Sequence, residues 1–239
     1  FTPTSTPTPT STPTLTPTST ATPTPVRLDR LDNFSDPNSG WFKGDVDNVR
    51  YSYLNGEYEI LVRPSNTGAS SIAPVPRLNS AASYSVEADF YLASDTHGGY
   101  GLVFDRVSQT DFYLLIADPN GGPDPHFAVR KRTPSGWQDV LGWVQAPDIH
   151  QGQATNHLKV TRTGGQLAFY ANGELLTTTT AIPAPTVGIQ VGLYGVNWDA
   201  SPSTLRYDNF HVVGTQAGSV AADSASAWPN VAEAPAPTR

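Results

Sequence analysis

The chain has 239 residues and a net charge of -7, with 14 Lys and Arg against 21 Asp and Glu. This balance argues against a nucleic-acid-binding protein, which normally presents a clustered basic face. The absence of Cys excludes disulfides, thiolate metal sites and cysteine nucleophiles. No run approaches the roughly 18 apolar residues of a membrane span, so none is predicted.

Residues 1–25 form a segment dominated by Thr and Pro, with 12 Thr, 3 Ser and 7 Pro. Such a composition cannot bury a hydrophobic core, so we expect an extended, hydrated arm. One interpretation is a polyproline spacer whose hydroxyls carry O-glycans. The candidate O-glycosylation sites are the even-numbered residues of the arm: Thr2, Thr4, Thr6, Thr8, Thr10, Thr12, Thr14, Thr16, Thr18, Thr20, Thr22 and Thr24.

A second interpretation of the arm follows from its alternation. Every even position from 2 to 24 is Thr, and every Pro stands at an odd position. Neighbouring residues of a strand direct their N–H groups to opposite sides, so the Thr side would keep every donor. The arm could therefore add to a sheet edge of another copy. Phe1 and Leu15 would share its other face with the prolines, and Trp228 in the tail would anchor to a second surface.

The body, residues 26–214, shows strand patterns separated by clusters of Gly, Asn, Asp and Pro. Asn55-Gly56, Gly164-Gly165 and Asn172-Gly173 predict tight hairpin turns. No helical period is evident, so we expect an all-β protein with one sheet packed on another, followed by an Ala/Ser/Pro-rich tail over 215–239. The expected strands are Val26–Leu31, Val49–Leu54, Glu57–Arg63, Tyr84–Leu92, Tyr100–Asp105, Phe112–Ala117, His126–Arg132, Trp137–Leu141, His157–Thr163, Gln166–Ala171, Glu174–Thr178, Val187–Tyr194 and Leu205–Val213.

Three segments of the body carry a resemblance to a known family. The run from Asn156 to Leu176 reads NHLKVTRTGGQLAFYANGELL, and the segments VGLYG at 191–195 and YDNFHV at 207–212 follow it. These segments resemble the late strands of concanavalin A-like domains of the laminin-G and glucanase type. The resemblance covers most of residues 26–214 and implies an antiparallel jelly-roll sandwich. Its motifs are structural, so they carry no information about a substrate.

The sequence does not show the catalytic motif of a glucanase of that family. Such an enzyme would carry Glu-x-Asp-x-x-Glu on one strand. Here Glu87 and Asp89 share a face, but Leu92 stands where the second Glu should be. Glu57 and Glu59 also share a face and are expected to lie on an exposed strand surface. No serine-hydrolase elbow and no zinc-like spacing of His occurs, so we expect no enzymatic activity.

One loop and one late residue are candidates for binding a sugar. The loop Asp95-Thr-His-Gly-Gly-Tyr100 has the Asp, Gly and aromatic content of lectin loops, and Trp198 follows a late strand. A carboxylate can fix sugar hydroxyls while an aromatic ring stacks on the apolar sugar face. The candidates are Asp95, His97, Tyr100 and Trp198. The alternative is that these residues form ordinary turns.

Two sets of oxygen-bearing residues are candidates for a structural calcium ion, although no cofactor is required. Asp118, Asn120 and Asp124 gather around glycines in one loop. Asp32 and Asp208 stand in the repeated motifs LDNF and YDNF, which open and close the body. Because first and last strands of such folds often lie side by side, these two carboxylates could share a site. The alternative for each set is bonding within turns.

Two functions remain after these exclusions. The first, which the alternation in the arm favours, is a self-associating extracellular protein whose arm adds to the next subunit, which would build an open, glycosylated filament or fibril. The second is a carbohydrate-binding module on a stalk. The chain begins at Phe1 and contains no Met, so we expect a processed product and an extracellular or cell-surface location. The expected partners are other copies of the chain and glycans, without nucleic acid or a membrane span.

Overall fold

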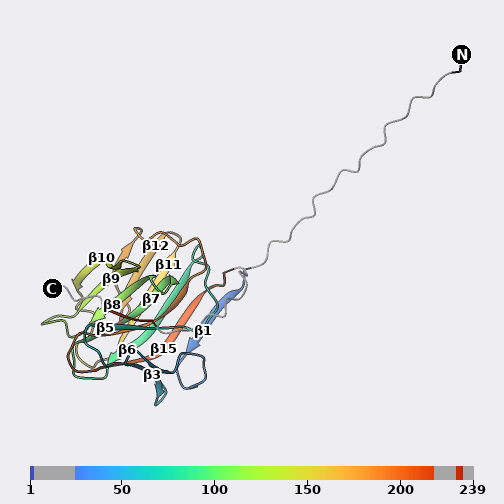
Figure 1. The fold of residues 1–239 in the computed structure, drawn as a ribbon. Helices are drawn as coiled ribbons and strands as arrows, with labels where there is room; N and C mark the ends of the chain where they lie inside the picture. Colours follow the sequence, from blue (N-terminus) through green and yellow to red (C-terminus); the bar gives the residue numbers. More distant parts are fainter. Residues whose placement is uncertain (3–24, 218–229, 234–239) are drawn as a thin grey trace.

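The computed structural model describes residues 1–2, 25–217 and 230–233. Within these residues the chain forms strands and no helix, and the strands build two antiparallel sheets packed face to face (Figure 1). The predicted all-β, two-sheet jelly-roll sandwich is therefore confirmed. No helix in the described ranges has the length and apolar character needed to cross a membrane.

The first sheet has nine strands. Its order is β13-β12-β11-β6-β15-β4-β3-β2, and β1 pairs with the second half of β15. Its strands are β1 (Arg27–Asp32), β2 (Gly44–Val46), β3 (Val49–Leu54), β4 (Glu57–Val62), β6 (Tyr84–Leu92), β11 (Asn156–Thr163), β12 (Gln166–Ala171), β13 (Glu174–Thr179) and β15 (Ser203–Thr215).

The second sheet has seven strands, in the order β10-β9-β8-β7-β14-β5-β16. Its strands are β5 (Thr67–Ile72), β7 (Gly98–Ser108), β8 (Asp111–Asp118), β9 (His126–Thr133), β10 (Gly136–Gln145), β14 (Gln190–Asn197) and β16 (Asn230–Glu233). The final strand comes from the segment that the sequence assigns to the tail. It pairs antiparallel with β5 and forms one edge of this sheet.

The core lies between the sheets and is built by alternation. In β6, Val86, Ala88 and Phe90 are fully buried, while Glu87 and Asp89 between them point to the outer surface. In β8 both faces are apolar, because Phe112, Leu114 and Ile116 belong to a second buried cluster on the outer side of the seven-stranded sheet. The seven-stranded sheet is thus buried on both faces across its middle strands.

The three predicted hairpin turns are confirmed. The register joins Leu54 to Glu57, Thr163 to Gln166 and Ala171 to Glu174, so each loop has two residues. Asn55 and Gly56 have φ values of 57° and 84°, as the favoured two-residue hairpin turn requires. These turns fix the register of their strands, and hence which side chains face the core.

The predicted proximity of the first and last strands of the body is also confirmed. Strand β1 runs antiparallel to β15, with Arg27 opposite Thr215 and Asp32 opposite Phe210 (Figure 1).

Residues 3–24 of the arm, including Leu15, lie outside the described residues, as does Trp228. Phe1 and Thr2 are exposed. The proposed strand pairing and O-glycosylation of the arm therefore stay predictions.

A buried ionic contact joins the two sheets through the core. Arg162 on β11 donates to Asp105 on β7, and both side chains are fully buried. The hydroxyl of Tyr84 on β6 donates to the other oxygen of Asp105 at 2.8 Å. A charge in this position is costly unless it is paired and hydrogen-bonded, so these three side chains stabilise one particular alignment of the sheets.

Candidate functional site

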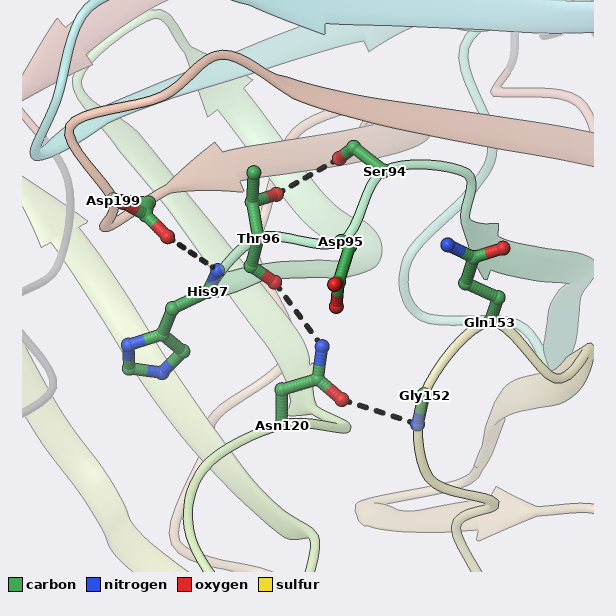
Figure 2. A pocket seen from close by; sticks show the side chains of 8 residues that line it. All are labelled: Ser94, Asp95, Thr96, His97, Asn120, Gly152, Gln153 and Asp199. Carbon is green, nitrogen blue, oxygen red and sulfur yellow. Dashed lines mark hydrogen bonds between the residues drawn. The ribbon is translucent and has the colours of Figure 1, made fainter.

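A pocket with a largely polar lining lies at one end of the sandwich, between four loops. These loops are 93–97, 119–125, 146–155 and 198–202, each of which connects two strands. The pocket has a volume of about 350 Å³. It is lined by Ser94, Asp95, Thr96, His97, Asn120, Gly152, Gln153 and Asp199 (Figure 2). None of these residues is aromatic apart from His97.

Asn120 joins three of the pocket's walls. Its side-chain nitrogen donates to the backbone oxygen of Thr96 at 3.1 Å, and its side-chain oxygen accepts from the backbone N–H of Gly152 at 3.1 Å (Figure 2). Its own backbone N–H donates to Asp118 at 3.2 Å. The side chain therefore serves as a fixed brace between loops that are far apart in the sequence.

His97 is held from three directions. Its backbone N–H donates to Asp199 at 3.1 Å, and its ring nitrogen Nε2 lies 3.1 Å from Asp118 Oδ2. Its ring packs against Trp198, with 5.1 Å between ring centroids. Bonds from the backbone N–H groups of His97, Ser201 and Ala200 lower the pKa of Asp199. The Asp199 carboxylate is thus committed to shaping its loop.

The hydroxyls beside the pocket are also committed. The Oγ atoms of Ser94 and Thr96 lie 2.8 Å apart, and the Thr96 hydroxyl lies 2.8 Å from that of Ser203. Ser94 Oγ further accepts from the backbone N–H of Thr204 at 2.9 Å. These contacts position the start of the loop that carries Asp95.

Two side chains of the lining are left for a ligand. Asp95 and Gln153 are exposed, and neither makes a side-chain hydrogen bond or ion pair within the described residues. Figure 2 shows the carboxylate of Asp95 directed into the space between Asn120 and Gln153, whereas the ring of His97 points away from it. An acceptor and an amide therefore face the pocket from opposite loops, on a frame that is braced by other residues.

The two predicted aromatic platforms are not available to a sugar. Tyr100 is fully buried in the core, where its ring stacks on Phe90 and its hydroxyl accepts from Asn156 at 2.7 Å. Burial raises the pKa of the Tyr100 hydroxyl. The prediction of Tyr100 as a sugar-binding residue is therefore wrong. Trp198 is only 8% exposed and lies between His97 and Trp143, so it supports the pocket from behind instead of lining it.

The first candidate calcium set does not form a cluster of free oxygens. Asp118 bonds His97 and the backbone of Asn120, and the side-chain oxygen of Asn120 is taken by Gly152. Asp124 accepts from Gln145 at 3.2 Å. In the described ranges no three His, Asp or Glu residues come together in a way that could hold a metal ion.

The second candidate calcium set, Asp32 and Asp208, bonds groups of the protein close to it, as the alternative of bonding within turns predicts. Asp32 accepts from the backbone N–H of Phe34 at 2.9 Å and from the indole of Trp41 at 3.1 Å. Asp208 accepts from the backbone N–H of Asn209 at 2.7 Å, and burial raises its pKa. Calcium stays a prediction that the contacts of these carboxylates do not support.

The carboxylates that could have formed a glucanase site have other partners. Glu87 and Asp89 bond basic residues on the outer face of the nine-stranded sheet, and Leu92 points into the core. Glu59 is 2% exposed and is held by Arg50 and Arg206 at 2.8 and 2.9 Å. The expectation of an exposed surface was therefore wrong for Glu59, because two arginines cover it.

Sequence reasoning found three of the pocket residues and missed the others. Asp95, His97 and Asn120 were candidates, although Asn120 was assigned to calcium. Gly152 and Gln153 lie in a ten-residue loop that carries no recognisable motif. Asp199 directly follows Trp198 and precedes Ala, Ser and Pro, a turn-like context that was the only signal for it.

Comparison with known proteins supports the fold and leaves the family open. No protein-family model and no curated protein matches the sequence. Among solved structures, the chain is similar to the CBM2 module of the evolved Dit of Lactobacillus casei BL23 phage J-1, with a TM-score of 0.57 and 12% identity. The match covers 82% of this chain and 99% of that one.

Two further solved structures share the architecture. The carbohydrate recognition domain of Emp46p, in its potassium-bound form, matches with a TM-score of 0.57 and 10% identity over 76% of this chain and 94% of that one. The β-glucanase of Bacillus licheniformis matches with a TM-score of 0.53 and 13% identity over 80% of this chain and 98% of that one. The chain thus has the concanavalin A-like jelly-roll fold, as the resemblance of its late strands implied.

Proposed function

We propose that this chain is a non-catalytic carbohydrate-binding domain that holds a sugar in the pocket between its four end loops. The observation that carries the proposal is the pair of unengaged polar side chains, Asp95 and Gln153, on a frame braced by Asn120. A carboxylate accepts hydrogen bonds from adjacent sugar hydroxyls, and an amide both donates and accepts. The resemblance to a carbohydrate-binding module and a carbohydrate recognition domain supports this choice.

The size and polarity of the pocket favour a small, hydrophilic part of a glycan. A volume of about 350 Å³ is at the lower end of ordinary ligand sites. Because no Tyr, Trp or Phe lines the pocket, binding would depend on hydrogen bonds instead of stacking. We therefore expect recognition of one or two sugar units with several free hydroxyls.

The proposal of a non-catalytic domain rests on the carboxylates of the pocket. Glycoside hydrolysis generally needs two carboxyl groups that flank the scissile bond. Of the two carboxylates in the lining, Asp199 is engaged by three backbone N–H groups, which lower its pKa and oppose a role as proton donor. Asp95 alone would then bind a hydroxyl without completing a catalytic pair.

The test is glycan binding by Asp95→Ala. The protein is first screened on an array of mono- and oligosaccharides, and the best ligand is measured by calorimetry. A hydrogen bond to a charged group contributes about 1.5–3 kcal/mol, so the variant should bind about tenfold to hundredfold more weakly. Gln153→Ala should weaken binding by a smaller factor, because the amide is uncharged.

Asp124→Ala is the matched control, since this carboxylate lies in the same loop as Asn120 but bonds Gln145 and does not line the pocket. It should bind like the native chain. Equal affinities of the Asp95→Ala and native chains, or no binding to any glycan with and without calcium, would overturn the proposal.

A second function, assembly through the arm, is favoured by one edge of the nine-stranded sheet. Strand β13 pairs only with β12 among the described strands, and its sequence ELLTTT contains no Pro, Lys or Arg. Leu175 is 54% exposed on this edge. Edges of this kind are usually blunted by Pro or charge. We propose β13 as the acceptor for the Thr side of an arm from a second copy, within an extracellular assembly that could carry O-glycans.

The absence of native Cys makes this second function testable by crosslinking. One variant carries Thr16→Cys in the arm and another carries Thr178→Cys in β13. When the two are mixed and oxidised, we expect a disulfide-linked pair that mass spectrometry identifies. Gln138→Cys, exposed on β10, an edge strand of the seven-stranded sheet, is the control acceptor. Equal yields with β13 and β10 would contradict the proposed edge.

A further inference from the structure

Strand β1 is joined to the body by a single short ladder. Among the described strands it pairs only with β15, through six residue pairs from Arg27–Thr215 to Asp32–Phe210. Asp32 is its one buried residue, Leu28 is partly buried, and the other four residues are exposed. This strand directly follows the Thr/Pro segment of residues 1–25. Whatever holds β1 to the sheet therefore also holds the arm to the body.

His211 on β15 bridges β1 to a third strand. Its Nε2 lies 2.9 Å from Asp29 on β1, and its Nδ1 lies 3.0 Å from Glu87 on β6. The two carboxylates thus contact opposite nitrogens of one imidazole ring. The ring is about 30% exposed, so it exchanges protons with solvent.

The charged groups around His211 come from every strand that borders it. On β1, Arg27 bonds Asp29 at 2.8 Å. On β11, Lys159 bonds Glu87 at 2.7 Å, and His157 lies 3.5 Å from Glu87. The remaining neighbours on this face are Asp89 on β6, which His157 contacts at 2.7 Å, and Asp208 and Asn209 on β15.

The chemistry of imidazole makes the bridge depend on protonation. A neutral imidazole has one N–H and one lone-pair nitrogen, so it can donate to only one carboxylate. The lone pair would then face the other carboxylate, which also offers only lone pairs. The imidazolium donates from both nitrogens, and both bonds are charge-assisted. The full bridge therefore exists only when His211 is protonated.

We propose that His211 is a proton-dependent clamp that fastens β1, and with it the N-terminal arm, to the nine-stranded sheet. The clamp is closed when the imidazolium bonds Asp29 and Glu87 together. It opens on one side when the ring loses its proton. The event is local, because one ladder of six residue pairs joins β1 to the sheet.

The pH range of the clamp follows from its three groups. The bond with Asp29 is the main cause that raises the pKa of His211 above 6.5. The stability that the clamp adds is thus fully present below the pKa of His211 in the unfolded chain. It is lost as pH rises through the higher pKa of His211 in the folded chain. The bond from His211 lowers the pKa of Asp29. Burial alone would raise the pKa of Glu87, but hydrogen bonds from Lys159 and His211 outweigh this effect, and the pKa is lowered. On the acid side the clamp is lost as pH falls through the lowered pKa values of the two carboxylates.

Hydrogen exchange of the full chain tests the proposal. Exchange of the amides of residues 27–32 is measured by mass spectrometry at pH 5.5 and 8.5 and corrected for intrinsic rates. Because the His211–Asp29 contact is partly exposed to solvent, its loss should change local opening by about 1.5- to 5-fold, with greater protection at pH 5.5. His211→Gln and Asp29→Asn should each remove this pH dependence.

His157→Gln is the control, because His157 lies on the same face and contacts Glu87 without touching β1. It should keep the pH dependence. NMR titration of the native chain gives a second measurement that needs no folded His211 variant: the pKa of His211 should lie above 6.5 and fall in Asp29→Asn. A pKa at or below 6.5, or undiminished pH dependence in His211→Gln, would overturn the clamp.

Discussion

Gly99 on β7 shows how a single residue without a side chain shapes the pocket. A Cβ atom there would lie 2.7 Å from the ring of Trp198 and 2.6 Å from the backbone oxygen of Ala117. Both distances are shorter than van der Waals contact permits. The ring of Trp198 in turn packs against the ring of His97. The backbone N–H of Trp198 also donates to the backbone oxygen of His97 at 3.0 Å. The glycine is thus needed for close approach and not for a turn.

We expect Gly99→Ala to displace Trp198 and disturb the loop that carries Asp95. Overpacking of this kind costs about 1–3 kcal/mol, which urea denaturation followed by tryptophan fluorescence measures. Glycan binding should weaken at the same time. Gly142→Ala is the control, since nothing lies within 4 Å of its added Cβ, and its stability should change by less than about 0.5 kcal/mol. Native-like stability of Gly99→Ala would contradict this account of Trp198.

At the scale of the elements, strands with a clear alternation were predictable and the others were not. The pattern of β6, β11 and β12 repeats every two residues, and the two-residue turns between hairpin strands are marked by Asn-Gly or Gly-Gly. Strand β5 was missed because its sequence, TGASSI, is small and weakly apolar. The structure gives the reason: a Cβ at Gly68 would lie 1.7 Å from the Tyr194 hydroxyl, so small residues make room for that ring.

The candidate site was predictable only where its chemistry lies in one loop. Asp95 and His97 belong to a single turn whose content indicated sugar binding. Gln153 and Gly152 reach the pocket from a loop about 55 residues further along the chain. Tyr100 was misassigned because loop content alone does not show which residue begins the next strand. At Tyr100 the chain has already entered β7, and the side chain turns into the core.

Across the whole molecule, Arg162 links the two sheets at a position where alternation predicts an apolar residue. It follows Leu158 and Val160 on the inward face of β11. Arg162→Met would leave Asp105 as an unpaired buried carboxylate, which costs about 3–5 kcal/mol. Urea denaturation should therefore show a large loss of stability.

Two comparisons make the prediction for Arg162 specific. Arg30→Met changes an exposed arginine on β1 and should alter stability by less than about 0.5 kcal/mol. Combining Arg162→Met with Asp105→Leu should recover part of the loss, because the stranded charge is removed. A loss below about 1 kcal/mol in Arg162→Met would show that the pair contributes little to the alignment of the sheets.

The register of β1 against β15 has a mechanical consequence. Arg27, where the arm joins the body, is paired with Thr215 at the end of β15, so the arm leaves at the first rung of an antiparallel ladder. A force that pulls the arm away from the sheet therefore loads the residue pairs of this ladder one after another, starting at Arg27. It does not load all of the pairs at once in shear. The advancing break meets His211 before it reaches Asp32. The proposed bond from His211 to Asp29 reinforces this ladder two residues along β1 from the point where the load enters.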